Sequence, residues 1–205
     1  MRSLWAGFVL CAAFAGSAHA LDVHQRPDWV LGIGMGYGRG AFERPSGVRD
    51  SYRNGAAPAI HFARLFGQHV AVGLTYEGWM LEFGSAVTDT VAVKVRRNLQ
   101  TFGAAVTVYP GSPTNATNGI FLRATAGWGW AGTAGLLVES GEPQHNAPRI
   151  DEWGLGTSAS AGYEFWIARN FTAGLGVGFN YLDLGGQLVD RGAFAAMLLN
   201  VNLYF

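Results

Sequence analysis

The chain has 205 residues, and its 14 basic and 14 acidic side chains give a formal net charge of zero. That balance argues against a basic nucleic-acid-binding protein, and a hydrophobic content of 49% excludes a disordered chain. Beyond residue 20 no stretch reaches the roughly 18 uninterrupted apolar residues that a membrane-spanning helix needs. The apolar residues must therefore be dispersed along the chain.

The first 20 residues have the pattern of a cleaved secretory signal. Arg2 supplies a positive start, residues 4–15 are apolar, and the segment closes on a small-x-small sequence. We therefore expect residues 1–20 to be removed and residues 21–205 to form one domain. Cys11, the only cysteine, lies inside this signal. The mature chain is expected to have neither a disulfide nor a thiolate zinc site.

The expected mature chain alternates between two kinds of side chain with a period of two. In the first such segment Leu31, Ile33, Met35 and Tyr37 alternate with glycines. This is the pattern of a β-strand with two different faces. Further segments of this kind lie near residues 57–66, 70–77, 100–109, 120–130, 155–165, 171–181 and 195–205.

The last segment is the most informative. One of its faces is apolar and ends on Phe205, while the other carries Asn200 and Asn202. An apolar face toward lipid and a polar face toward a lumen are typical of a transmembrane β-barrel. The sequence predicts an all-β fold, an eight-stranded antiparallel up-and-down transmembrane β-barrel.

The connections support this prediction through their unequal lengths. Short turns are expected at residues 67–68, 110–118 and 167–170, on the periplasmic side. Longer external connections are expected at residues 39–55, 81–90, 131–151 and 183–191. Alternation continues through residues 91–97, and its parity switches near residues 98–101. Either the third and fourth strands project beyond the membrane or a bulge resets their register, and we expect the projection. Two aromatic belts are expected at the strand ends, one of Trp128, Trp130, Trp153 and Tyr181 and the other of Phe66, Tyr109, Phe165, Phe171 and Phe205.

Residues 119–130, 153–165 and 170–181, with the ending Leu203-Tyr204-Phe205, resemble the small outer-membrane barrels of the OmpX and OmpA type. The resemblance implies an integral protein of the bacterial outer membrane, in contact with outer-membrane lipids and lipopolysaccharide. It also implies insertion by the barrel-assembly machinery, with Leu203 and Phe205 as the C-terminal assembly signal. We expect a monomer that binds no nucleic acid.

Four polar residues are candidates for a network inside the lumen. By strand parity His61, Glu77, Arg123 and Glu164 all point inward. Because isolated buried charges are costly, we expect opposite charges to pair. Such a network can be a static plug or the gate of a narrow polar pore, and the small interior of an eight-stranded barrel favours the plug.

Three functions follow from these features. The first is a structural or surface-interaction barrel that displays its loops, with the basic residues 39–55 placed to meet lipopolysaccharide phosphates. The second is a narrow, porin-like channel for small solutes, and the third a lipid-modifying enzyme. No serine and histidine are patterned as a catalytic pair, so we expect no enzyme, and neither a cofactor nor a metal site.

Overall fold

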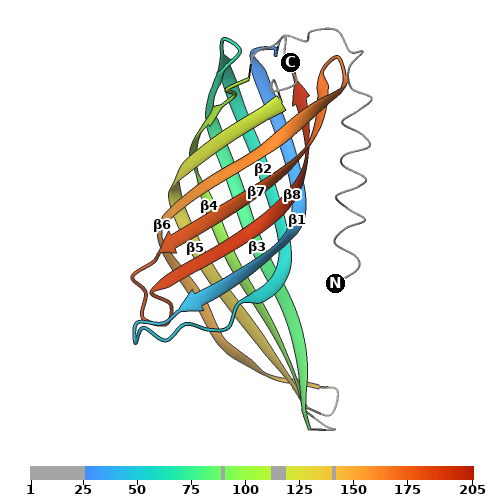
Figure 1. Cartoon of the computed structure of the whole chain (residues 1–205). Coiled ribbons are helices and arrows are strands. Elements are labelled where there is room, and N and C mark those ends of the chain that lie inside the picture. The colour runs from blue at the N-terminus through green and yellow to red at the C-terminus, as the bar shows by residue number, and fades with distance from the viewer. Residues whose placement is uncertain (1–25, 89–90, 112–118, 140–141) are drawn as a thin grey trace.

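The computed structural model describes residues 26–88, 91–111, 119–139 and 142–205. The predicted signal at residues 1–20 lies outside them. The described chain forms a closed barrel (Figure 1). Its strands are β1 (Trp29–Glu43), β2 (Arg53–Phe66), β3 (Val70–Thr88), β4 (Val91–Val108), β5 (Ile120–Glu139), β6 (Glu142–Ala168), β7 (Phe171–Asp183) and β8 (Arg191–Tyr204).

Each strand pairs antiparallel with its neighbours in sequence, and β1 pairs with β8 to close the sheet. The closing ladder runs from Val30 opposite Tyr204 to Glu43 opposite Arg191. The predicted eight-stranded antiparallel barrel is therefore confirmed. Among the described residues, no helix has the length and apolarity needed to cross a membrane.

The predicted alternation is also confirmed on every strand. On β1, Ile33, Met35 and Tyr37 are 60–62% exposed on the outer wall, whereas the glycines between them point inward against β8 and β2. On β8, Met197 and Leu199 are exposed and Asn202 is buried. The outer wall is thus apolar, as contact with lipid requires.

The two ends of the barrel differ in the connections that they carry, and we call them the turn end and the hairpin end. The turn end carries the short connections 67–69 and 169–170 and the start of β1, while β3 to β6 project past the wall at the hairpin end (Figure 1). Pairing between β3 and β4 continues past Ala86, opposite Ala92, to Thr88, opposite Val91, so the predicted projection is confirmed.

The predicted external connection at residues 131–151 is formed mostly by strands rather than by a loop. β5 continues to Glu139 and β6 begins at Glu142, so this region is a strand hairpin. Outside the membrane no lipid face imposes apolar alternation, so strand pairing there leaves little trace in the sequence.

One residue of the predicted aromatic belts was also misplaced. Tyr109 is fully buried, at 0% exposure, whereas Phe66 and Phe205 are 58% and 53% exposed as expected. Tyr109 follows the outward-facing Val108, so the pleat turns its ring into the barrel.

The ladder between β2 and β3 contains a gap. Ala59 pairs with Glu77 and Ala56 pairs with Met80, but no pair forms at Pro58 between them. Proline has no backbone N–H to give to a ladder. The register is unchanged across the gap, so the wall is locally weakened without being kinked.

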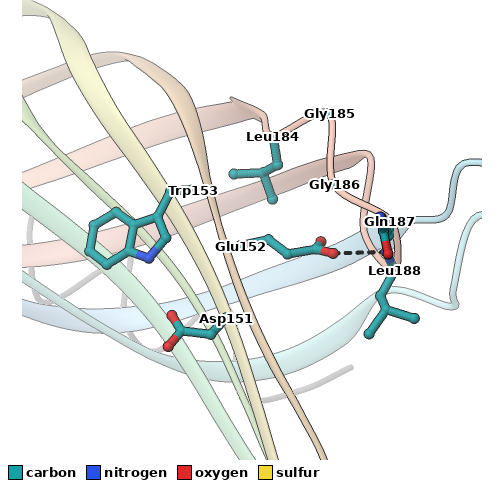
Figure 2. Close-up of a pocket in the computed structure, with 8 residues that line it drawn as sticks. All are labelled: Asp151, Glu152, Trp153, Leu184, Gly185, Gly186, Gln187 and Leu188. Carbon is teal, nitrogen blue, oxygen red and sulfur yellow. Dashed lines mark hydrogen bonds between the residues drawn. The ribbon is translucent and has the colours of Figure 1, made fainter.

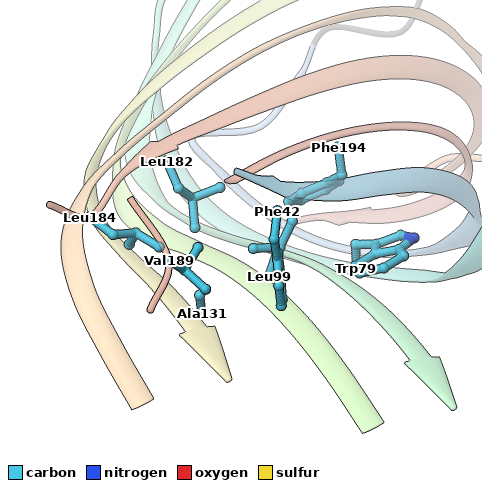
Figure 3. Close-up of a cluster of buried hydrophobic side chains, with 8 residues drawn as sticks. All are labelled: Phe42, Trp79, Leu99, Ala131, Leu182, Leu184, Val189 and Phe194. Atoms are coloured by element: carbon cyan, nitrogen blue, oxygen red, sulfur yellow. The ribbon is translucent and has the colours of Figure 1, made fainter. Parts of the chain in front are cut away.

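Both ends of the interior are filled with apolar side chains. The hairpin-end cluster consists of Phe42, Trp79, Leu99, Ala131, Leu182, Leu184, Val189 and Phe194, which converge from six strands and the β7–β8 loop (Figure 3). The turn-end cluster consists of Val30, Ala63, Leu65, Ala71, Tyr109, Phe121 and Tyr204. A polar layer lies between these two clusters.

Candidate functional site: a polar lumen and a charged rim

The polar layer holds all four residues predicted for the lumen. His61, Glu77, Arg123 and Glu164 are 5%, 4%, 9% and 3% exposed. They come from β2, β3, β5 and β6, at inward positions of the pleat. The structure therefore places them in one compartment, although it does not join them into one network.

Arg123 contacts a threonine and a histidine. Its Nε donates to Thr107 Oγ1 at 2.9 Å, and its Nη1 lies 3.3 Å from His61 Nδ1. His61 Nε2 has no hydrogen-bond partner among the described residues. His61 fits here because it packs against Gly32, where any side chain would overlap the imidazole ring.

The two carboxylates have separate partners. Asn180 donates to Glu77 at 2.7 Å, and Tyr204 Oη donates to Glu164 at 2.6 Å. Thr172 adds a longer bond to Glu164, at 3.3 Å. The expected ion pairing was therefore wrong: in the described part of the chain Arg123 forms no salt bridge with either glutamate.

The turn end is closed by a contact that the sequence did not indicate. The Arg26 guanidinium carbon lies 3.9 Å from the centre of the Tyr109 ring, and Arg26 is 4% exposed. The main chain of Arg26 exchanges two hydrogen bonds with the Gln68 side chain, of 2.7 and 3.1 Å. Tyr109 in turn touches Tyr204, with 3.3 Å between the hydroxyl oxygens. Arg26 precedes the first alternating segment, so no strand pattern could have revealed it.

The rim at the hairpin end carries shared ion pairs. Glu43 binds Arg49 at 2.7 Å and Arg191 at 3.6 Å, and Asp50 binds Arg97 at 2.7 Å. The hydrogen bond to Glu43 raises the pKa of Arg49 above its ordinary value. These contacts join the β1–β2 loop to β4 and β8.

The rim arginines nevertheless remain accessible to solvent, although Arg44 also pairs with Asp50 at 3.7 Å and Arg191 with Asp190 at 3.5 Å. The side chains of Arg44, Arg49 and Arg191 are 61%, 58% and 50% exposed. Val48 and Tyr52 of the same loop are 58% and 44% exposed. Exposed arginine beside apolar and tyrosine side chains is a composition typical of recognition surfaces.

A pocket of about 490 Å³ lies between the β7–β8 loop and residues 151–153 of β6 (Figure 2). The Glu152 carboxylate crosses to this loop and accepts hydrogen bonds from the backbone N–H groups of Leu188 and Val189, at 2.8 and 2.7 Å. Gly186 packs against the same carboxylate. Because these contacts already satisfy Glu152, its role here is to hold the loop.

The remaining candidates are catalytic and metal-binding side chains. Ser158 Oγ has no hydrogen-bond partner among the described residues, so Ser158 and His61 do not form a nucleophile and base pair. Within the described ranges, no group of three His, Cys, Asp or Glu side chains is placed to hold a metal ion.

Comparison with known proteins finds the fold among solved structures. No protein-family model and no curated protein sequence matches this chain. The chain is similar to Ail, the attachment invasion locus protein of Yersinia pestis, solved in complex with the heparin analogue sucrose octasulfate. The TM-score is 0.57 at 15% identity, over 87% of this chain and 99% of Ail.

Two further structures have lower scores. Neisserial surface protein A gives a TM-score of 0.49 at 11% identity, over 86% of this chain and 97% of that protein. The N-terminal β-barrel domain of Pseudomonas aeruginosa OprF gives 0.46 at 14% identity, over 87% and 100%. The similarity to Ail shows that the chain has the fold of the small outer-membrane barrels, as its sequence resemblance indicated.

Proposed function

We propose that this protein is a closed, non-enzymatic barrel of the bacterial outer membrane that presents its hairpin end to the cell exterior as an interaction surface. The observation that carries this proposal is the filling of the lumen at both ends. Trp79 and Leu99 are 1% and 0% exposed at the hairpin end, as are Tyr109 and Tyr204, both 0%, at the turn end. A barrel whose lumen is filled at both ends is suited to displaying an interaction surface rather than to transporting solutes.

The proposed surface is the arginine-rich rim. Arg44 and Arg49 extend from the β1–β2 loop, and Arg191 begins β8 beside them. Guanidinium groups bind phosphate and sulfate with paired hydrogen bonds. We infer that lipopolysaccharide phosphates, or sulfated sugars outside the cell, are its ligands. The sulfated ligand in the Ail complex agrees with this inference.

The remaining features of the proposal concern export and assembly. Residues 1–20 would direct export and be cleaved. The barrel-assembly machinery would then insert the chain through a C-terminal signal that includes Leu203 and Phe205. Leu203 lies on the outward-facing side of β8, the strand that closes the barrel, and Phe205 follows that strand and is 53% exposed. A single closed barrel needs no partner subunit, so the proposed form is a monomer.

The proposed rim surface is tested by measuring the binding of the purified protein to lipopolysaccharide and, in parallel, to a sulfated polysaccharide. Replacing Arg44 and Arg49 together by Gln should weaken binding to one or both ligands and reduce its dependence on salt. Arg64→Gln, at the turn end, is the matched control and should bind as the wild type does. Unchanged binding by the rim variant would contradict the proposed surface.

The closed lumen is tested by conductance in planar lipid bilayers. The wild-type protein should give no stable current steps, because apolar side chains fill both ends of the path. Stable steps in the wild type would instead favour the narrow channel.

A further inference from the structure

The polar layer of the lumen contains a group of buried side-chain oxygen atoms without partners. Thr101, Thr125, Ser158 and Asn180 are 0%, 5%, 8% and 2% exposed. The hydroxyl oxygens of the first three, and Oδ1 of Asn180, have no hydrogen-bond partner among the described residues. Buried polar atoms in proteins nearly always have a partner. Four such oxygens in one layer therefore indicate a bound species that contacts them.

Strand pairing brings these oxygens together. Ser158 on β6 is the direct cross-strand partner of Thr125 on β5 and of Asn180 on β7. On the facing wall, Thr101 of β4 is the partner of Glu77 of β3. The 2.7 Å hydrogen bond from Asn180 Nδ2 to Glu77 joins the row to this pair across the lumen. Asn180 Oδ1 belongs to the same amide, so it lies beside the Glu77 carboxylate.

The spacing of these side chains suits an ion. Residues directly opposite each other on neighbouring strands have Cβ atoms about 4.5–5.5 Å apart. The oxygen ligands of a hard cation such as Ca²⁺ lie about 2.3–2.6 Å from it, so two ligands on opposite sides are up to about 5 Å apart. One cation can therefore contact the oxygens of a cross-strand pair without a shift of the wall.

Glu77 supplies a negative charge that no basic side chain neutralises. Its carboxylate is held by Asn180, and in the described part of the chain it forms no salt bridge. Arg123 is directed toward the turn-end cluster, where its guanidinium carbon lies 5.5 Å from the centre of the Phe121 ring. Because Glu77 is only 4% exposed, its charge is costly without an opposite charge nearby.

We propose that Glu77, Thr101, Thr125, Ser158 and Asn180 bind one monovalent cation, sodium, inside the barrel. Carboxylate, hydroxyl and amide oxygens are ligands of hard cations. One monovalent ion neutralises the single carboxylate, whereas a divalent ion would leave an excess positive charge in the interior. Water also satisfies buried hydroxyl groups, but it does not balance the charge of Glu77. The bound ion would join the β3–β4 wall to the β5–β7 wall.

The test is urea unfolding of the wild type in lipid vesicles, in about 0.2 M sodium chloride and in choline chloride of the same concentration. The two salts screen the rim arginines equally, and choline is too large to be held between paired side chains. With a sodium dissociation constant of about 10 mM, this sodium concentration should raise the ratio of folded to unfolded protein about twentyfold. An equal ratio in the two salts would leave water as the occupant and overturn the proposal.

Variants locate the sodium effect. Glu77→Gln removes the charge, and Ser158→Ala removes one ligand oxygen while the charge stays. Both should lose the difference between the two salts. Ser160→Ala is the matched control and should keep it, because Ser160 lies on the same strand but pairs with Arg123.

Heat-modifiable gel migration verifies that each variant is folded, and Thr125→Val replaces Glu77→Gln if that variant does not fold. A sodium effect that survives Ser158→Ala together with Glu77→Gln or Thr125→Val would overturn the site. Stabilisation of the wild type by about 1 mM calcium chloride in place of sodium would overturn the monovalent assignment.

Discussion

Replacing Arg123 by Met removes the two hydrogen bonds that its guanidinium makes inside the barrel and keeps most of its aliphatic stem. Thr107 Oγ1 then loses a donor at 2.9 Å, and His61 Nδ1 loses its contact at 3.3 Å. Since His61 Nε2 already has no partner among the described residues, the whole ring becomes unsatisfied. Each buried polar group left without a partner costs about 1–3 kcal/mol. We expect Arg123→Met to lower the free energy of unfolding by about 2–4 kcal/mol.

The partner of Arg123 is identified by a double-mutant cycle. Urea unfolding in lipid vesicles, followed by tryptophan fluorescence, gives the free energy for Arg123→Met, His61→Leu and the double variant. The double variant should be less destabilised than the sum of the single effects by about 1 kcal/mol, because the two residues are in contact. The control cycle pairs Arg123→Met with Glu77→Gln, whose carboxylate is held by Asn180. This cycle should be additive within about 0.5 kcal/mol. Strong coupling to Glu77 with none to His61 would refute the reasoning and restore an ion-paired lumen.

Three further outcomes are expected. Trp79→Ala removes a side chain that is 1% exposed and should lower the free energy of unfolding by about 3–5 kcal/mol in the same assay. Trp153→Ala, at a residue 63% exposed on the outer wall, should lower it far less. Equal losses of stability would contradict the packing of the hairpin-end cluster. Phe205→Asp should leave the protein in the periplasm, as cell fractionation would detect, and normal outer-membrane levels would contradict the assembly signal. An impermeant thiol reagent added to intact cells should label Tyr52→Cys and spare Asn170→Cys, both at exposed positions; the reverse result would invert the topology.

Local pattern was enough to predict the barrel wall. The alternation of Leu31, Ile33 and Met35 with glycine depends only on the pleat and on lipid outside, so both strand identity and facing could be read from neighbouring residues. The same rule, followed one residue past Val108, would have placed Tyr109 inside. That error came from assigning an aromatic residue near a strand end to a membrane belt by its type alone.

Contacts across the barrel could not be predicted in this way. Asn180 and Glu77 lie on strands that are not neighbours. Which inward residues meet across the lumen depends on the stagger of the strands around the barrel, which no single strand encodes. Parity therefore predicted that Arg123 points inward, but charge alone gave it the wrong partner. The Arg26 contact with Gln68 joins residues 42 positions apart and lacks a periodic signal of any kind.

The gap in the β2–β3 ladder at Pro58 has a consequence for motion. Gly78 and Trp79 lie opposite the gap and make no ladder pair with β2 there, although both pair with β4 on their other side. Because ladder pairs are already missing here, separating the two strands at this point breaks fewer backbone hydrogen bonds than it would elsewhere in the wall, where each broken bond is costly within a bilayer. Local separation of β2 from β3 should begin here and appear as faster amide hydrogen exchange on β2 and β3 beside the gap than along the β1–β8 ladder. The Trp79 ring helps to fill the hairpin end, so local separation of β2 from β3 would move this ring as well. The packing that closes the hairpin end of the lumen would then depend on the stability of this one strand pair.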